Sequence, residues 1–333
     1  MGDLHKVVIT DFIDVQDPLK PERAVLDGVA DVSALGARDD DALIGQIEDA
    51  AALITFHYAV ITPRSIERLE RCKVIARAGV GYDNVDLAAA RARGIPVVNV
   101  PDYGTEEVAN SAIGMTLALA RGIHYYNSRL RGLRGTWQYT ESAPLYRLRG
   151  RVFGIVGLGR IGMAAAIRAK ALGMDVVFYD PFRQDGFDKT LGIQRAGTLE
   201  ELLNQAFVLS IHCDLNETSQ GMITRDAIGL MPRGSFLVNT ARAGMLDADA
   251  VIEALATGQL AGAGIDVLET EPPEPDDSVV AAWRDPSHPA HHRLILNPHA
   301  AFYCEEGFDE LRTKASAACR AAILGEPLRN VVN

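Results

Sequence analysis

The sequence predicts a two-domain α/β protein in which each domain is built on a doubly wound parallel sheet. Apolar segments of strand length alternate with segments of helix length over residues 7–98 and again over residues 151–298. This alternation is typical of βαβ units, whose parallel sheets are covered by helices on both faces. The chain has 333 residues, which is more than one compact core usually contains. We therefore expect two cores.

The N-terminal part of the chain contains the elements of one sheet. Thr62 and Pro63 precede a helix, since proline is tolerated in the first helical turn, where its missing N–H costs little. Gly94 ends a second helix. We expect strands at residues 7–10, 50–56, 74–78 and 95–98, and helices at residues 65–69 and 87–93.

A break in this pattern at residues 99–102 precedes a long helix. Thr105 begins this helix, which continues to about residue 120 with apolar side chains at helical spacing. The next segment, residues 121–149, is basic, rich in aromatic residues and poorly periodic. A nucleic-acid-binding arm has such a composition, but the acidic balance of the whole chain favours a loop-rich connection or a subunit contact.

The most specific local pattern is a glycine-rich turn between a predicted strand, residues 152–156, and a predicted helix, residues 163–172. Gly157 permits the tight turn, Gly159 lets the backbone approach a pyrophosphate, and Gly162 lets the helix pack closely on the strand. The pyrophosphate would accept hydrogen bonds at the helix N-terminus, where the helix dipole favours an anion. The turn therefore predicts a dinucleotide site rather than a purely structural glycine turn.

Asp180 follows the next predicted strand, residues 176–179, and lies eighteen residues after Gly162. A carboxylate at this position accepts hydrogen bonds from a ribose diol and repels a 2′-phosphate. The predicted cofactor is therefore NAD rather than NADP. Arg183 lies close enough in the sequence to leave NADP open as an alternative.

Three polar residues follow predicted strands in the remainder of the chain: Arg242, Glu271 and His299. The strands expected here are residues 207–212, 235–239, 262–267 and 294–297, and the helices are residues 199–203, 248–255 and 306–324. A guanidinium holds a carboxylate through two parallel bonds, and an imidazole exchanges a proton near neutral pH. A carboxylate beside that imidazole raises its pKa and fixes its tautomer. Each residue alone is more often an ion-pairing or loop residue, but behind a dinucleotide turn they predict hydride transfer between NAD and a 2-hydroxy or 2-oxo acid.

The composition argues against several other classes of protein. The 33 basic and 44 acidic residues give a net charge of −11, which disfavours generic nucleic-acid binding. No apolar run approaches the ~20 residues needed to cross a bilayer, and residues 1–10 lack the basic and apolar regions of a signal peptide. The four cysteines are scattered without Cys-x-x-Cys spacing. We therefore expect reduced thiols, no metal and a cytoplasmic protein.

The chain resembles the D-isomer-specific 2-hydroxyacid dehydrogenase family over almost its whole length. The resemblance is carried by the three polar residues, by the glycine turn with Tyr179-Asp180-Pro181, and by residues 78–86, 211–213 and 237–242. It implies a Rossmann NAD-binding domain, residues 102–299, inserted into a flavodoxin-like substrate domain formed by residues 1–101 and 300–333. It also implies a homodimer, and hinges near Pro101 and Pro298.

The resemblance implies a role for each residue in these motifs. Arg242 would clamp the substrate carboxylate, His299 would be the general acid/base, and Glu271 would be its partner. Backbone N–H groups around Val80 and Gly81 would bind the same carboxylate. Arg160 would lie against the pyrophosphate and Asp266 beside the nicotinamide amide. The expected cofactor-binding residues are Gly157, Gly159, Arg160, Ile161, Gly162, Asp180, His212, Thr240, Ala241 and Asp266.

Within the family, the chain looks closest to the C-terminal-binding-protein branch, through residues 191–195, 209–216 and 299–303. Phe302 stands where that branch usually has tryptophan, so a substrate-facing aromatic residue is altered. The long stretch 274–293 contains His288, His291 and His292, and we expect a solvated loop or lid edge there in preference to a metal site.

The function implied is that of an NAD-dependent D-2-hydroxyacid dehydrogenase, which reduces small 2-oxo acids. Two alternatives remain open from the sequence. One is an NAD(H)-sensing transcriptional co-regulator of the C-terminal-binding-protein type. The other is an enzyme on the same scaffold that acts on another small anion, such as formate or phosphite.

Overall fold

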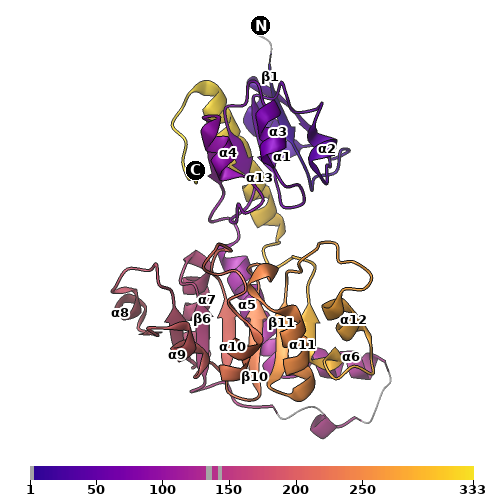
Figure 1. Cartoon of the computed structure of the whole chain (residues 1–333), viewed down its shortest axis with the longest axis vertical. Coiled ribbons are helices and arrows are strands. Elements are labelled where there is room, and N and C mark those ends of the chain that lie inside the picture. Colours follow the sequence, from indigo (N-terminus) through magenta and orange to yellow (C-terminus); the bar gives the residue numbers. More distant parts are fainter. Residues whose placement is uncertain (1–3, 133–136, 142–144) are drawn as a thin grey trace. The chain divides into compact units, whose positions relative to one another are not determined.

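The computed structural model describes residues 4–132, 137–141 and 145–333, so part of the 121–149 segment lies outside the described residues. The chain divides into two compact units (Figure 1). One comprises Met1–Gly104 and Tyr303–Asn333, and the other comprises Thr105–Phe302. The boundaries expected from the sequence lie after residues 101 and 299. Each unit is built on its own sheet.

The first unit contains a five-stranded parallel sheet in the order β2-β1-β3-β4-β5, which is the flavodoxin-like order. Its topological switch point lies between β1 and β3. The sequence did not predict β2, because only one of its residues is a large apolar side chain and alternate positions are exposed. The strands are β1 (His5–Ile9), β2 (Ala30–Ala34), β3 (Ala52–Thr55), β4 (Ile75–Arg77) and β5 (Val97–Asn99).

Helices from both ends of the chain cover this sheet. Thr62 and Asp86 cap α3 and α4 by accepting hydrogen bonds from the N–H groups of Arg64 and Ala89, which stabilises the first turn of each helix. Helix α13 packs against α1, β3 and β4, so the C-terminal residues complete the first unit. The helices are α1 (Lys20–Leu26), α2 (Asp40–Leu43), α3 (Pro63–Arg68), α4 (Leu87–Ala92) and α13 (Glu305–Leu324).

The second unit contains a seven-stranded parallel sheet in the order β12-β11-β10-β9-β6-β7-β8. This order has the Rossmann topology, with its switch point between β6 and β9. All residues of β9 and β10 are buried, as expected for central strands covered on both faces. The two doubly wound α/β sheets are confirmed. The strands are β6 (Val152–Val156), β7 (Asp175–Tyr179), β8 (Gln194–Arg195), β9 (Val208–Ile211), β10 (Ser235–Asn239), β11 (Leu260–Ile265) and β12 (Leu294–Leu296).

The helices of the second unit form two layers (Figure 1). Helices α5 and α7 pack on one face of the sheet, and α9, α10 and α11 pack on the other. Helix α5 lies so close to β11 that a Cβ atom on Gly264 would be 2.9 Å from Met115. The helices are α5 (Thr105–Ala120), α6 (Ile123–Arg131), α7 (Arg160–Ala171), α8 (Phe187–Leu191), α9 (Leu199–Leu203), α10 (Arg225–Leu230), α11 (Ala248–Thr257) and α12 (Ser278–Arg284), with 3-10 turns η1 (Tyr139–Glu141), η2 (Ala243–Met245) and η3 (His291–Arg293).

Two expectations for connecting segments need correction. Helix α6 lies within residues 121–149, and α12 lies within residues 274–293, both of which were expected to be loops. Three residues of α12, Val279, Val280 and Ala282, are buried, so a short apolar run packs this helix onto the unit. Across the described part of the chain, no helix is long and apolar enough to span a membrane.

Candidate functional site

The glycine turn lies at the switch point of the seven-stranded sheet, between β6 and α7. Gly157 has a φ of 88°, and a Cβ atom on it would lie 2.5 Å from the backbone nitrogen of Cys213. A Cβ atom on Gly162 would lie 2.2 Å from the carbonyl oxygen of Gly157. The protein itself therefore requires glycine at both positions.

Gly159 differs from these two glycines. Its φ is −76°, which any residue can adopt, and a Cβ atom on it would meet none of the described atoms within 4 Å. The fold does not require glycine here. The open space beside Gly159 instead fits a ligand that approaches the backbone closely, as the pyrophosphate of a dinucleotide does.

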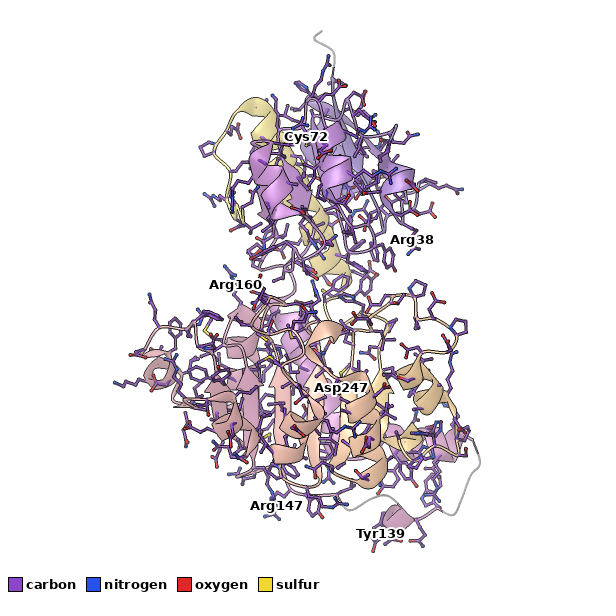
Figure 2. All side chains as sticks on the ribbon, in the orientation of Figure 1. Arg38, Cys72, Tyr139, Arg147, Arg160 and Asp247 are labelled. Atoms are coloured by element: carbon purple, nitrogen blue, oxygen red, sulfur yellow. The ribbon has the colours of Figure 1, made fainter. Side chains whose placement is uncertain are left out.

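The N-terminus of α7 offers hydrogen-bond donors beside this space. None of the described side chains caps the helix, and its first intrahelical bond runs from Met163 N–H to the Gly159 carbonyl. The N–H groups of Arg160, Ile161 and Gly162 therefore have no acceptor within the helix. The exposed Arg160 side chain starts at the same end of α7 (Figure 2). This arrangement suits an anion.

Asp180 lies at the carboxyl end of β7, next to the glycine turn. Its Oδ2 accepts a hydrogen bond of 2.9 Å from Leu158 N–H, and its Oδ1 accepts one of 3.0 Å from Phe182 N–H. The side chain is only 12% exposed, and Arg183 Nε lies 3.9 Å from Oδ2. The carboxylate is thus fixed on the turn that would hold the pyrophosphate, where a ribose diol can bind it.

Two further predicted cofactor-binding residues carry buried polar atoms that lack a hydrogen-bond partner among the described residues. These atoms are His212 Nδ1, after β9, and Thr240 Oγ1, after β10. Buried polar groups are normally paired, so these atoms fit a site completed by a polar ligand. Burial lowers the pKa of His212 to about 4, and the ring is therefore neutral at physiological pH. Its Nε2 lies 2.9 Å from Ser210 Oγ.

Arg242, Glu271 and His299 follow three neighbouring strands, β10, β11 and β12. Carboxyl ends of parallel strands meet at one edge of a sheet. His299 Nδ1 lies 2.6 Å from Glu271 Oε2, and Glu271 Oε1 accepts a hydrogen bond of 2.8 Å from Leu268 N–H. Both side chains are about one-fifth exposed, at 20% and 22%. The structure thus joins an imidazole to a carboxylate and leaves Nε2 as the outer nitrogen of the ring.

Asp266 organises the backbone around His299. This carboxylate is 1% exposed and accepts hydrogen bonds from the N–H groups of Ala300 and Ala301, while the Asp266 carbonyl accepts one from His299 N–H. Burial raises the pKa of Asp266. His299 has a φ of 52°, a strained conformation that these bonds hold. The family resemblance implies a position for Asp266 beside the nicotinamide amide, but it does not indicate this contact with the His299 loop.

Asn239 organises the loop of Arg242 in a similar way, and sequence analysis did not single it out. Its Oδ1 accepts a hydrogen bond from Ala241 N–H, and its Nδ2 donates to the Arg242 carbonyl. Asn239 is fully buried at the end of β10. The only available signal was its position at a strand end, immediately before the Thr240-Ala241-Arg242 motif.

The remaining predicted substrate residues lie in two places. Phe302 belongs to the second unit, where its ring packs edge-on against His299 with 6.2 Å between centroids. Val80 and Gly81 belong to the first unit, after β4. Asn99 Nδ2 donates a hydrogen bond of 2.7 Å to the Val80 carbonyl. This bond fixes the loop from the β5 side.

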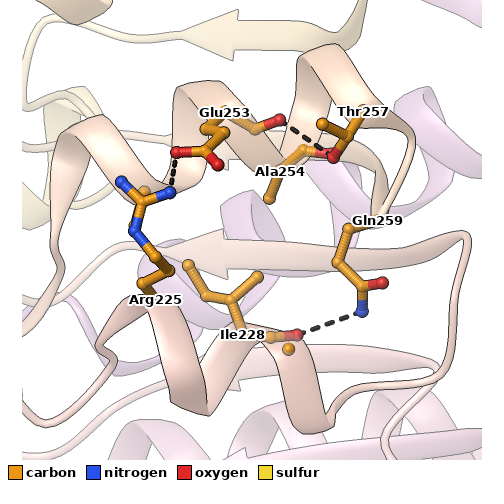
Figure 3. Close-up of a pocket in the computed structure, with 8 residues that line it drawn as sticks. Arg225, Ile228, Glu253, Ala254, Thr257 and Gln259 are labelled. Atoms are coloured by element: carbon orange, nitrogen blue, oxygen red, sulfur yellow. Dashed lines mark hydrogen bonds and ion pairs between the residues drawn. The ribbon is translucent and has the colours of Figure 1, made fainter.

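His288 and His291 of the 274–293 stretch make contacts with the backbone. His288 Nδ1 accepts a hydrogen bond from Ala290 N–H, and His291 Nδ1 lies 2.5 Å from the Trp283 carbonyl. A separate surface hollow lies between α10 and α11, with the Arg225–Glu253 ion pair at one end and Gln259 at the other (Figure 3). None of the predicted site residues lines this hollow.

Comparison with known proteins identifies the family. Residues 113–301, more than half of the chain, match the model of the NAD binding domain of D-isomer specific 2-hydroxyacid dehydrogenases. The chain belongs to this family. Its cofactor is NAD, as Asp180 predicts, and the glycine turn with Asp180 lies inside the matched range. The matched residues are the part of these proteins that binds NAD.

Curated relatives and solved structures of similar proteins agree with the family. The chain is 33% identical to D-3-phosphoglycerate dehydrogenase of Methanocaldococcus jannaschii over 98% of its own length and 59% of the relative. It is 32% identical to C-terminal-binding protein 1 of Caenorhabditis elegans, over 91% of its length and 42% of the relative. The chain thus spans about half the length of these two relatives.

Two crystal structures match nearly the whole chain. The TT0316 protein of Thermus thermophilus is 31% identical with a TM-score of 0.84, covering 98% of this chain and 100% of that one. D-lactate dehydrogenase of Aquifex aeolicus, complexed with NAD and lactic acid, is 25% identical with a TM-score of 0.85, covering 96% of each chain.

Proposed function

We propose that the protein uses NADH to reduce a small 2-oxo acid to the D-2-hydroxy acid. The observation that carries this proposal is the 2.6 Å contact between His299 Nδ1 and Glu271 Oε2. It gives the second unit a proton donor at the sheet edge where the strand before Arg242 also ends. The lactic acid in the related Aquifex aeolicus complex is a compound of this class.

When bound, NADH supplies the hydride for the keto carbon. In the protonated ring, His299 Nδ1 donates to Glu271, and Nε2 carries the proton for the ketone oxygen. The Glu271 carboxylate stabilises the positive charge of the imidazolium and fixes the ring orientation. Arg242 holds the substrate carboxylate through two parallel bonds. In the reverse direction, neutral His299 accepts the hydroxyl proton.

The other residues bind and orient the ligands in this proposal. Val80 and Gly81 supply backbone N–H groups to the substrate carboxylate, so the first unit acts as the substrate domain. Phe302 borders the side chain of the substrate. Arg160 contacts the pyrophosphate, His212, Thr240 and Ala241 line the cofactor groove, and Asp266 holds the nicotinamide amide in addition to its contacts with the His299 loop.

A second candidate function is an NAD(H)-sensing transcriptional co-regulator of the C-terminal-binding-protein type. The 32% identity to the Caenorhabditis elegans protein supports it. Residues 191–195, 209–216 and 299–303 carry the likeness to that branch. In either case we propose a cytoplasmic homodimer that uses α5 and the 121–149 segment for contact.

The oxidation of NADH by purified protein, followed by absorbance, tests the proposal. The panel of substrates runs from glyoxylate through pyruvate and hydroxypyruvate to branched and aromatic 2-oxo acids. Rapid turnover with one member supports the dehydrogenase and defines the size of the pocket beside Phe302. Tight NADH binding without turnover on any member favours the sensor or a substrate outside the panel.

A further inference from the structure

Arg195 makes contacts that the proposed reaction does not use. It ends β8, the two-residue edge strand of the seven-stranded sheet. Its Nη2 donates hydrogen bonds of 2.9 Å to the Asp180 carbonyl and 2.8 Å to the Arg183 carbonyl. Its Nη1 lies 2.9 Å from Asp185 Oδ1, and its guanidinium lies over the Phe178 ring at 5.7 Å. One side chain thus holds the loop that follows β7 at three points.

The two carbonyl contacts determine the shape of this loop. The chain leaves the sheet at Asp180, so the carbonyls of Asp180 and Arg183 are not paired with a neighbouring strand in the ladder of β7 and β8. A guanidinium has donors in a rigid fork that matches two acceptors. The ion pair with Asp185 contributes little, because Asp185 is fully exposed and exposed pairs are weak.

The braced loop carries one of the two bonds that orient the Asp180 carboxylate. Phe182 N–H, which lies between the two carbonyls that Arg195 holds, donates to Asp180 Oδ1. The other bond, from Leu158 N–H to Oδ2, comes from the glycine turn. A displaced loop would therefore rotate or release the carboxylate that receives the ribose diol.

Arg183 lies on the same loop, so the choice between NAD and NADP depends on the shape of this loop. Its Nε is buried, has no hydrogen-bond acceptor among the described residues, and lies 3.9 Å from Asp180 Oδ2. Its guanidinium lies over the Phe187 ring at 5.0 Å. A cation this close to the ribose site attracts a 2′-phosphate unless the Asp180 carboxylate stays in place.

We propose that Arg195 is a positioning residue for the adenosine end of NAD. By bracing the loop of residues 180–185, it presents Asp180 to the ribose and keeps this carboxylate between Arg183 and the 2′ position. It thereby sets both the affinity for NAD and the preference for NAD over NADP. Arg195 lies in the 191–195 stretch, to which the sequence assigns no function.

Binding measurements on the full chain test this assignment without any substrate. NADH, NADPH and ADP-ribose, which lacks the nicotinamide, are titrated calorimetrically or by fluorescence against Arg195→Ala and Arg195→Gln. We expect Kd for NADH and for ADP-ribose to rise together by roughly tenfold, because a preorganised contact is lost. We also expect the ratio of Kd for NADPH to Kd for NADH to fall, which a merely structural role would not produce.

Two control variants separate the hydrogen bonds from Arg195 to the two carbonyls from other effects of the substitution. Asp185→Ala removes only the exposed ion pair, and Arg233→Ala removes an exposed arginine that donates to the Thr257 carbonyl elsewhere in the same unit. Both should bind NADH as the wild type does. An NADH Kd within twofold of wild type in either folded Arg195 variant overturns the proposal. A weaker affinity for NADH with an unchanged affinity for ADP-ribose also overturns it. So does a loss of NADH affinity in Asp185→Ala equal to that in the Arg195 variants.

Discussion

His299 Nδ1 and Glu271 Oε2 lie 2.6 Å apart, although 28 residues separate them in the chain. Glu271 is held on its other oxygen by Leu268 N–H, and the backbone of His299 is held by Asp266. Both partners are therefore fixed before any ligand binds. In such a pair, the carboxylate both orients the imidazole and stabilises the imidazolium by its charge.

Removal of that charge should slow turnover more than it weakens cofactor binding. Glu271→Gln keeps an acceptor for His299 but cannot stabilise the imidazolium, so we expect kcat to fall by about 10–100-fold, with Kd for NADH within twofold. His299→Gln should lower kcat by about 10²–10⁴-fold. Steady-state kinetics with the best 2-oxo acid measures both. Glu269→Gln, an exposed neighbour, serves as the control, and an unchanged kcat in Glu271→Gln would refute the pairing role.

The glycines of the turn should separate ligand binding from stability. Gly159→Ala places a methyl group in open space, so we expect normal thermal stability and a weakened affinity for NADH. Gly162→Ala places Cβ 2.2 Å from the Gly157 carbonyl, and overpacking of this kind costs roughly 1–3 kcal/mol or more. Calorimetry of both variants, with an NADH titration, provides the comparison. A destabilised Gly159→Ala with normal NADH affinity would show that the open space is not a cofactor site.

The buried ring of His212 should make stability depend on pH between 4 and 6.5. The pKa of His212 is about 4 in the folded chain against an ordinary 6.5. Between these values the unfolded chain binds a proton that the folded chain does not, so the free energy of unfolding falls as the pH decreases. The difference between these two pKa values corresponds to at most roughly 3–4 kcal/mol. The stability that depends on the neutral His212 ring is fully present above pH 6.5 and is lost progressively as the pH falls to about 4.

Urea unfolding across that pH range measures the effect. His212→Gln lacks the titrating ring and should show a shallower decline of stability than the wild type, while His5→Gln, at an exposed position, should follow the wild type. Parallel curves for the wild type and His212→Gln would mean that the histidine does not contribute to the pH dependence.

A buried arginine in the first unit should dominate the stability of the C-terminal helix. Arg312 of α13 forms bonds of 2.6 and 2.8 Å with Glu22, which is 1% exposed, and it also pairs with Asp17. Arg312→Ala leaves the Glu22 charge buried and unpaired, which costs about 3–5 kcal/mol. Lys314→Ala, on the same helix, removes only pairs with exposed acids and should cost less than ~1 kcal/mol. Chemical denaturation compares the two, and equal losses would contradict this account.

Elements with a strong local signal were predictable from the sequence. The helix expected from Thr105 to about residue 120 and the strands expected at 152–156 and 235–239 have the same bounds in the structure. Strand β2, helix α6 and helix α12 were among the elements that were missed. Strand β2 has a single large apolar residue, and none of the apolar residues of α6 is buried. Helix α12 is a short apolar run without a repeating pattern, and its burial depends on packing against the rest of the unit. The spacing of apolar residues predicts an element only where burial repeats regularly along that segment.

The sequence by itself determined the two parallel sheets and NAD as the cofactor, and it singled out the glycine turn, Arg242, Glu271 and His299 as candidates. The sheets and the glycine turn follow from short local patterns, and the three polar residues follow from their occurrence together with that turn. Only the tertiary structure decided that Asp266 holds the His299 loop, that Asn239 holds the Arg242 loop, and that Arg195 braces the loop of Asp180. The first and third of these join residues 34 and 15 positions apart. The order of the strands brings such residues to one edge of the sheet, and a local pattern contains no information about that order.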